Sequence, residues 1–319
     1  MGGMVVRGFA EADLGAAARL LAGRHREHRR RYPLLRGDFE DVEIALAEVT
    51  GVWESEGASG AVAVDGGELR GYLLGAPKGA VWGPNVWVES AGVAALEAET
   101  VRDLYAAAAA RWVDEGRTAH YVLVPNDAAL VDAWFRLGFG AQHAHGIRDL
   151  PEPAKPRTEL VIRRAERKDI PVLAELDLAL PQHQGLSPVF SAGVVPTVQE
   201  AVADWQQSID DPEFATFVAE DNGQVIGSAI GCSLEKSSTH QGLARPDNAG
   251  FLGFAAVLPA ARGRGAGRAL GETVLQWCRE AGYDSVVTDW RVTNLLSSRT
   301  WPRLGFEQSF LRMHRLIGY

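Results

Sequence analysis

The chain has 319 residues, of which 46% are hydrophobic and 23% charged, and its formal net charge is −9. This length suits about two domains, and the composition is that of an ordinary globular protein. The acidic balance argues against a protein that binds nucleic acid, and no apolar run reaches membrane-spanning length. The cysteines, Cys232 and Cys278, lack metal-ligand spacing and suit a reducing compartment. We therefore expect a cytoplasmic protein with no nucleic-acid partner, no membrane partner and no metal.

The first half of the chain alternates short strands with helical patterns. The predicted elements are a strand, a helix that starts at Asp13, a hairpin around Asp65-Gly66-Gly67 and a further strand, at residues 5–7, 13–30, 61–74 and 86–88. The stretch after the last of these strands contains Glu89, Glu97 and Glu99 and no arginine before Arg102. A carboxylate-rich loop repels phosphate, so this half is not expected to bind a phosphorylated ligand there.

The first helix ends in a strongly basic run. Between Arg24 and Arg31, only Glu27 is neither arginine nor histidine. A solvated helix face, aided by cations near the helix C-terminus, is the favoured interpretation, and a wall of an anionic acceptor site is the alternative. Farther on, His143 and His145 stand two residues apart on a predicted strand, where a structural role is favoured over metal binding because no third ligand is evident.

The second half of the chain repeats the first. Arg7 and Asp13 align with Arg163 and Asp169 at an offset of 156 residues, and the same offset aligns the two hairpins. Near the ends of the copies the offset becomes 167, where Trp134 aligns with Trp301. Three matching blocks in the same order indicate two tandem copies of one fold. The prolines Pro151, Pro153 and Pro156 lie between the copies, so we expect domains at 1–150 and 159–319 joined by a stiff linker at 151–158.

The second copy contains all the predicted elements of the first and a longer central strand. The expected order is a strand, two helices, a hairpin, a central strand, a long helix, a strand, a short helix and a last strand, starting near residues 160, 169, 198, 214, 251, 268, 285, 294 and 310. The expected fold class is α+β, in which each copy has a mixed, mostly antiparallel sheet flanked by helices, as the family resemblance described below implies.

A glycine-rich stretch follows the central strand of the second copy. The strand ends at Pro259, and Arg262, Gly263, Arg264, Gly265, Ala266, Gly267 and Arg268 lead into the long helix. Glycines let a backbone approach a ligand closely, and the free N–H groups of a helix start favour an anion. The sequence therefore predicts a pyrophosphate site. It does not contain the Gly-Lys pair of a Walker A loop or the G-x-G-x-x-G spacing of a dinucleotide fingerprint.

The pattern V-x-P-x-x-R-x-x-G-x-G, from Val257 to Gly267, resembles the acyl-CoA loop of the GNAT superfamily of N-acyltransferases. A second stretch, N-x-x-S and then W-x-R-L-G-F, from Asn294 to Phe306, resembles the other signature of that superfamily. The resemblance covers both copies, but its specific motifs lie in the second copy. A tandem arrangement with one degenerate copy is similar to that of mycothiol-synthase-like proteins.

The resemblance implies acetyl-CoA as cosubstrate and transfer to an amine of a small molecule or peptide, by a monomer or homodimer. The residues expected to bind acetyl-CoA are the strand end, the glycine-rich turn and the start of the short helix: Ala255, Ala256, Val257, Arg262, Gly263, Arg264, Gly265, Ala266, Gly267, Arg268, Asn294 and Ser297.

The acceptor amine must lose a proton before it attacks a thioester, and the oxyanion needs a donor such as the backbone N–H groups near Ala255–Val257. Many family members place a tyrosine acid seven residues after the asparagine, where this chain has Trp301. Asp289 and His314 are the candidate catalytic bases, with a structural role as the alternative for each. Direct transfer is the expected mechanism. The rival hypotheses are a non-catalytic acyl-CoA-binding or regulatory module and transfer to oxygen or of a longer acyl chain.

Overall fold

The structure, a computed structural model, describes residues 3–79, 82–150, 152, 158–191, 193 and 195–318. The chain divides into two compact units, which are treated separately below. The first unit comprises Met1–His145, Gln241–Pro246 and Gln308–Tyr319, and the second comprises Gly146–His240 and Asp247–Glu307. The predicted linker, 151–158, lies outside the described residues except for Glu152 and Thr158.

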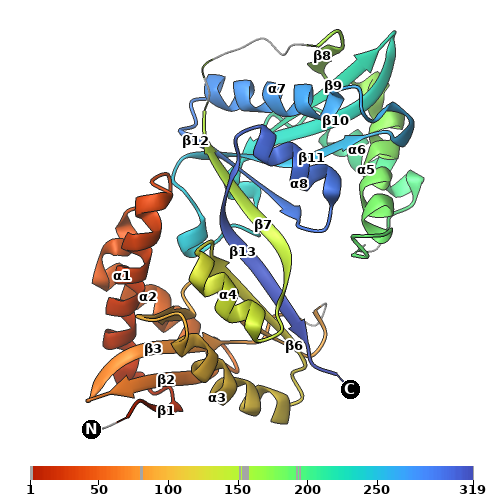
Figure 1. Cartoon of the computed structure of the whole chain (residues 1–319). Helices are drawn as coiled ribbons and strands as arrows, with labels where there is room; N and C mark the ends of the chain where they lie inside the picture. Colours follow the sequence, from red (N-terminus) through yellow and green to blue (C-terminus); the bar gives the residue numbers. More distant parts are fainter. Residues whose placement is uncertain are drawn as a thin grey trace. The chain divides into compact units, whose positions relative to one another are not determined.

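The first unit is built on strands that helices cover (Figure 1). Its strands are β1 (Val5–Gly8), β2 (Ser59–Asp65), β3 (Glu68–Gly75), β4 (Asn85–Val88), β5 (Val93–Ala95), β6 (Ala119–Pro125), the first part of β7 (Gly140–Asp149) and most of β13 (Glu307–Leu316). Its helices are α1 (Leu14–Arg31), α2 (Val42–Trp53), α3 (Thr100–Asp114) and α4 (Ala128–Arg136).

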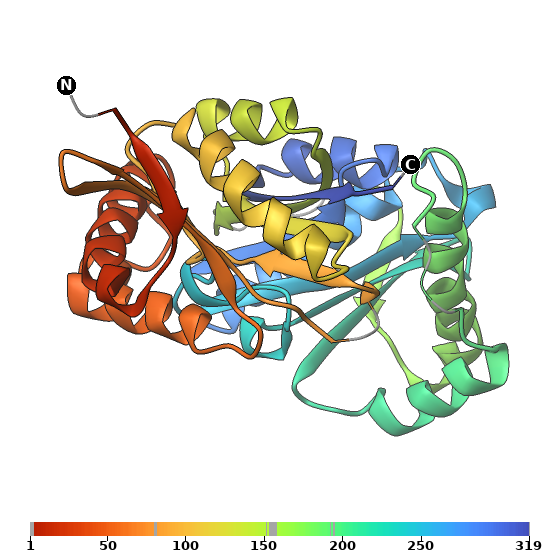
Figure 2. The same ribbon diagram turned by 90° about the horizontal axis from the view of Figure 1, so that it is seen from below.

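The strands of the first unit form two sets. One has the order β1-β2-β3-β5 and is antiparallel throughout. In the other, β6 pairs in parallel with β4 and antiparallel with β13. Consecutive residues of β2, Ala61 to Ala63, are all buried, which means that both faces are covered. Helices α1 and α3 both contact β3, while α2 packs against α1 (Figure 2).

The last strand of the chain is part of the first unit. β13 follows β6 in an antiparallel register from Phe310↔Pro125 to Leu316↔Ala119, although it closes the second sequence copy. The end of β7, from Gly146 onward, belongs to the second unit, although it closes the first copy. Division by sequence repeat and division by compactness therefore differ at the two final strands.

The second unit has the same order of elements. Its strands are β8 (Val161–Arg164), β9 (Phe214–Asp221), β10 (Gln224–Ser233), β11 (Ala249–Val257) and β12 (Ser285–Arg291). Its helices are α5 (Ile170–Gly185), α6 (Val198–Ser208), α7 (Ala266–Glu280) and α8 (Leu295–Arg303). The strand order is β12-β11-β10-β9-β8, with β11 and β12 parallel and the other pairs antiparallel. Helices α5 and α7 both pack on β10 and β11.

The repeated Arg–Asp pair fixes the start of the first helix in each unit. The guanidinium of Arg7 binds both carboxylate oxygens of Asp13 at 2.7 Å, and Arg163 binds Asp169 at 2.7 and 2.9 Å. Each aspartate also accepts a backbone N–H from three residues earlier, Ala10 and Glu166 respectively. A bidentate ion pair that also binds a backbone N–H just before the helix explains why this spacing occurs in both copies.

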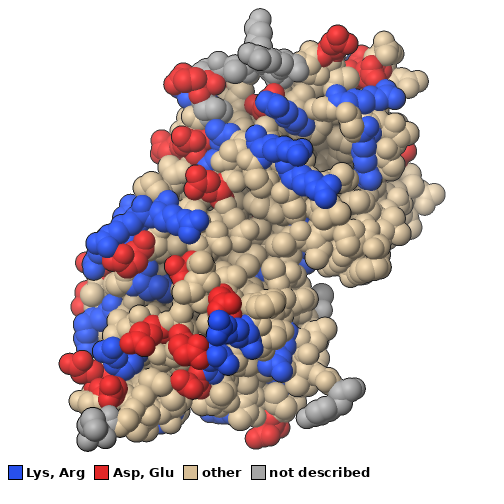
Figure 3. All heavy atoms as spheres, in the orientation of Figure 1, with Lys and Arg blue, Asp and Glu red and all other residues tan. Residues whose placement is uncertain are grey.

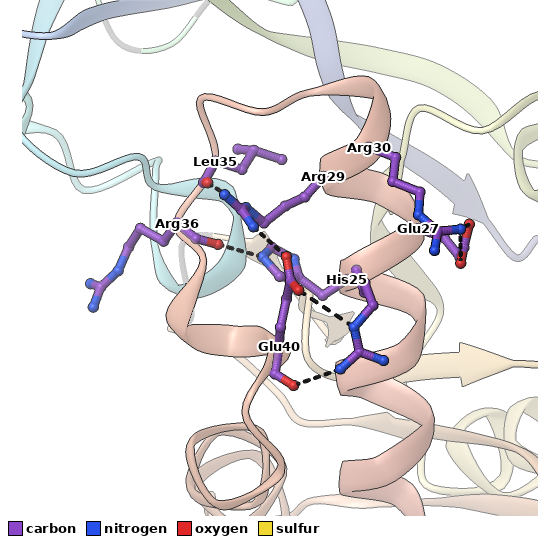
Figure 4. Close-up of polar contacts among 8 residues, drawn as sticks. His25, Glu27, Arg29, Arg30, Leu35, Arg36 and Glu40 are labelled. Carbon is purple, nitrogen blue, oxygen red and sulfur yellow. Dashed lines mark hydrogen bonds and ion pairs between the residues drawn. The ribbon is translucent and has the colours of Figure 1, made fainter.

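The basic end of α1 holds the following loop in place (Figure 4). His25 is buried and donates from Nε2 to the carbonyl oxygen of Arg36 at 2.7 Å. Arg29 donates to the carbonyl oxygen of Leu35 at 2.7 Å and pairs with the carboxylate of Glu40. The favoured interpretation of a solvated face therefore holds for the exposed Arg26, Arg30 and Arg31 but is wrong for the buried histidines.

Candidate active site

The two parallel strands of the second unit separate part of the way along. Their register runs from Ala249↔Ser285 to Leu252↔Thr288, and the Thr288 hydroxyl donates to the carbonyl oxygen of Leu252 at 2.9 Å. β11 then continues to Val257 alongside β10 only. The register with β10 skips Gly253, a bulge that turns the strand away at the point of separation. A gap lined by backbone polar groups of β11 therefore opens toward β12.

The predicted residues Ala255, Ala256 and Val257 lie in this diverging stretch. They pair with Ala229, Ser228 and Gly227 of β10, respectively. Up to Leu252, one edge of β11 pairs with β12. Beyond Leu252, a ligand can hydrogen-bond to the backbone along this same edge, as an added strand does.

The glycine-rich turn joins the diverging strand to α7. Gly263 and Gly265 both have φ of 84°, a conformation that side chains with a Cβ rarely adopt. A Cβ at either position would meet nothing within 4 Å, so the space over the turn is open. Among the described residues, no side chain caps the first turn of α7. The N–H groups of Ala266, Gly267 and Arg268 are consequently available to an anion, and they carry the positive end of the helix dipole.

The three arginines of the turn are held differently. Arg264 forms an ion pair with Asp221 of the β9–β10 turn at 2.7 Å, and Arg268 pairs with Glu272, one turn later in α7, at 2.7 Å. Arg262 lies nearest the strand, with Nε 3.4 Å from the carbonyl oxygen of Val257. The side chains of Arg264 and Arg268 are 56% and 71% exposed, so their ion pairs are weak and exchangeable. Figure 3 shows Lys and Arg side chains over the region where Figure 1 draws α7 and α8.

Asn294 and Ser297 organise the start of α8. The Asn294 side chain is buried, and its Oδ1 accepts from the N–H of Leu296 at 3.1 Å. The Ser297 hydroxyl donates to the carbonyl oxygen of Asn294 at 3.2 Å. His183 of α5 places Nε2 3.2 Å from the same Oδ1. His183 could not be found from the sequence, because its contact with Asn294 spans 111 residues and no local pattern indicates it.

Trp301, at the position of the family's tyrosine, is a packing residue. It is 7% exposed, and its ring lies 6.3 Å from that of Phe306, edge to face. A Cβ at Gly271 of α7 would lie 3.4 Å from the Trp301 ring. Trp301 therefore anchors α8 against α7.

The two candidate bases lie in different units. Asp289 follows Thr288, the last residue of β12 that pairs with β11, and its side chain is 20% exposed. His314 lies on β13 in the first unit, opposite Tyr121 in register, with Nδ1 3.2 Å from Nε2 of Gln142. Of the two, Asp289 lies at the point where the strands separate.

The corresponding place in the first unit is filled by protein. β4 pairs with β6 up to Val88, and β5 pairs with β3 from Val93, so the equivalent strand is interrupted between them. Arg24 donates from Nη2 to the carbonyl oxygen of Ser90 at 2.7 Å and from Nη1 to that of Val93. The Tyr72 hydroxyl donates to the carbonyl oxygen of Ala91 at 2.6 Å. In the first unit, the side chains of Arg24 and Tyr72 therefore fill the place between β4 and β5. The first copy is accordingly the degenerate one.

Two further features bear on function. Among the residues that the structure describes, no three His, Cys, Asp or Glu side chains gather in a way that could hold a metal ion. Within the same residues, every helix is too short or too polar to cross a membrane. A split parallel strand pair, a glycine turn and an uncapped helix together have the layout of a domain that binds an extended, anionic ligand.

Comparison with known proteins relates part of the chain to a family and the whole chain to a fold. Residues 183–306 match the model of the acetyltransferase (GNAT) family. A GCN5-related N-acetyltransferase from Sphaerobacter thermophilus has a similar fold, with a TM-score of 0.55, 16% identity and coverage of 99% of this chain and 97% of that one. A tandem GNAT protein from the clavulanic acid biosynthesis pathway aligns with 16% identity, 99% coverage of both chains and a TM-score of 0.46. A search of curated protein sequences returned no match.

Residues 183–306, in the second half of the chain, are thus similar to the GNAT acetyltransferase family, and the chain as a whole has the fold of a GCN5-related N-acetyltransferase. The expected fold class, two tandem copies of a mixed sheet flanked by helices, is confirmed.

Proposed function

We propose that the second half of the chain transfers an acetyl group from acetyl-CoA to a primary amine of a small molecule or peptide. The observation that carries this proposal is the split between β11 and β12 leading directly into the open Gly263–Gly265 turn. The residues present fit the cosubstrate, because the turn offers free N–H groups, open space and nearby guanidinium groups. Ala255, Ala256 and Val257 would hold the thioester arm along β11, and Arg262, Arg264 and Arg268 would face the pyrophosphate with the glycine turn.

The order of the chemical steps follows from the protonation state of the acceptor amine. An alkyl ammonium has a pKa near 10, so it must lose a proton before its lone pair attacks the thioester carbon. Backbone N–H groups of the diverging strand can stabilise the oxyanion that forms. The carbon–sulfur bond then breaks, and the nitrogen loses a second proton as it becomes an amide. The thiolate takes up one of the two protons, and the other is released to solvent. Direct attack in a ternary complex needs no nucleophilic side chain, which agrees with the burial of Cys232 and Cys278. Burial raises the pKa of these thiols to about 11 and about 12.

The proposed partners are the amine acceptor and acetyl-CoA, and no nucleic acid or membrane is among them. The proposed protein is cytoplasmic and is a monomer or a homodimer. The family's phenol acid is absent at Trp301, so Asp289 is the proposed proton acceptor of the second half. His314 stays a weaker candidate, because it lies in the unit that does not contain the glycine turn.

A non-catalytic acyl-CoA-binding or regulatory module is the second candidate. The observation that favours it is the buried, packing role of Trp301 where the family has an acid. Both candidates bind acetyl-CoA, and they differ in whether acetyl reaches an amine.

Calorimetric titration with acetyl-CoA and an acetyl-transfer assay on a panel of amines test the proposal. Gly265→Glu should weaken binding of acetyl-CoA at least ~10-fold. The new carboxylate would repel the phosphate proposed to bind there, and a residue with a Cβ would be strained at this positive φ. Gly282→Glu is the matched control, since Gly282 has φ of 81°, nothing within 4 Å and lies at the other end of α7. Equal binding by both variants, or no heat in the wild type, would overturn the proposal. Binding without transfer to any amine would favour the module. Hydroxyl acceptors and longer acyl-CoAs in the same panel separate the remaining alternatives.

A further inference from the structure

His240 lies close to the point where β11 and β12 separate, next to Phe251 and Asp289. It precedes β11, and its side chain is 0% exposed. Its Nδ1 is 3.1 Å from the hydroxyl of Ser237, which also accepts the N–H of Thr239 at 3.2 Å. Its ring meets that of Phe251 of β11 edge to face at 5.5 Å. An imidazole held on two sides in this way has little freedom to change rotamer.

The buried imidazole faces the carboxylate of Asp289. Nδ1 of His240 and Oδ2 of Asp289 are 4.0 Å apart, which is within ion-pair distance and longer than a hydrogen bond. Asp289 comes directly after Thr288, whose hydroxyl ties β12 to Leu252 at the last paired position. The carboxylate thus lies at the start of the gap, 4.0 Å from a buried imidazole.

We propose that His240 is a positioning residue that fixes the Asp289 carboxylate as proton acceptor for the acceptor amine. The inference rests on the proposed N-acetyl transfer and adds a residue to it. Asp289 takes one proton from the ammonium group, the neutral amine attacks the thioester carbon, the carbon–sulfur bond breaks and the thiolate leaves. The nitrogen loses a second proton to solvent as it becomes the amide. The proton on Asp289 then passes to the thiolate, so that the carboxylate is restored and the thiol is formed.

The role of His240 follows from burial and charge. A carboxylate that accepts a proton must stay oriented toward the amine, and a misplacement of about 1 Å can cost on the order of 100-fold in rate. The groups that face the ring include Ser237 from its own segment, Phe251 from β11 and Asp289 from β12. Asp289 is the charged group of these three.

Steady-state kinetics of His240→Asn, Asp289→Asn and the double variant test the proposal in the full chain. We expect kcat to fall ~10- to 100-fold in each single variant, with the KM for acetyl-CoA unchanged within about twofold. The double variant should be no slower than Asp289→Asn, because both changes remove one function. His120→Asn is the matched control, since His120 is also buried and hydrogen-bonded but belongs to the first unit. A wild-type kcat in His240→Asn, with loss of stability alone, would overturn the proposal.

A spectroscopic test separates this proposal from the assignment of activity. In histidine-labelled protein, the His240 imidazole signals, identified by their loss in His240→Asn, should shift in Asp289→Asn, and the His240 pKa should fall by about half a unit or more. Should His240→Asn fail to fold, Ser237→Ala identifies the same signals through its contact with Nδ1. Unmoved signals in Asp289→Asn would overturn the pairing even in an active enzyme. A clear shift in a protein that transfers no acetyl group would support the pairing and contradict the proposed function.

Discussion

The guanidinium of Arg24 donates a 2.7 Å hydrogen bond to the carbonyl oxygen of Ser90, across 66 residues of sequence. It also donates to the carbonyl oxygen of Val93, and thereby bridges the interruption between β4 and β5. In the first unit, the Arg24 side chain thus hydrogen-bonds backbone carbonyl groups at the interruption. At the corresponding place in the second unit, backbone groups of β11 face a gap. Desolvation lowers the pKa of Arg24 to about 10, which leaves the group cationic at neutral pH.

Arg24→Ala should destabilise the first unit by about 2–3 kcal/mol, because it leaves buried carbonyl oxygens without donors. Arg24→Lys should recover little of this loss, since a single ammonium does not reproduce a planar fork that reaches two acceptors. Urea unfolding measures both. Arg30→Ala is the control: its side chain is 68% exposed and pairs within α1, and its effect should stay within about 0.5 kcal/mol. Equal effects of the Arg24 and Arg30 variants would show that the bridge does not stabilise the unit.

Stability should fall in mild acid because of two buried histidines of α1. Burial lowers the pKa of His25 to about 4 and that of His28 to about 3, and each donates from Nε2 to a carbonyl oxygen, of Arg36 and Ser309 respectively. The unfolded chain takes up these protons near pH 6.5, whereas the folded chain resists them down to about pH 3–4, so stability is lost as the pH falls below 6.5.

By about pH 5 each histidine should cost about 2 kcal/mol relative to pH 7.5. Denaturant unfolding at several pH values measures the slope. His28→Gln keeps a donor at this position without a titrating group, so its stability should depend less steeply on pH between about 4.5 and 6.5. An unchanged slope would assign the acid sensitivity to other groups.

Asp221 pairs with Arg264, one of the arginines proposed to face the pyrophosphate, and removing this carboxylate should tighten binding of acetyl-CoA. The pair is 2.7 Å long and its side chains are 56% and 23% exposed, so Asp221→Asn should change stability by less than about 0.5 kcal/mol. Affinity should rise a few-fold at low salt and less at high salt, because the effect is electrostatic and screened. Titration calorimetry at two salt concentrations measures it. Arg264→Ala should lower affinity and its salt dependence, and a rise instead would exclude Arg264 from the phosphate site.

Local sequence patterns predicted much of the fold. The Arg7–Asp13 and Arg163–Asp169 pairs repeat at one offset because each fixes a strand-to-helix connection, and both bidentate contacts form. The glycine turn was predictable because positive φ at Gly263 and Gly265 demands glycine.

Contacts between distant segments were not predictable. β13 closes the second sequence copy and pairs with β6, and a single strand carries no sign of which partner it will find. Arg24 bridges an interrupted strand, yet it lies in a basic run whose other arginines are exposed or bind a nearby loop. His240 and Asp289 are 49 positions apart in sequence, so their proximity comes from the packing of the β10–β11 segment.

Trp301→Tyr restores the residue that the family resemblance expects, and it should not increase kcat. The position is 7% exposed and packs on Phe306 and beside Gly271, so a phenol there would be buried among apolar groups rather than presented to a thiolate. Replacing the larger ring leaves a void and buries a hydroxyl, and should cost about 1–3 kcal/mol of stability. Thermal unfolding and the acetyl-transfer assay measure the two effects, with Trp301→Phe as the control that has the smaller ring but no hydroxyl. A tenfold rise in kcat in the tyrosine variant alone would mean that this side chain reaches the leaving group, and that α8 moves when acetyl-CoA binds.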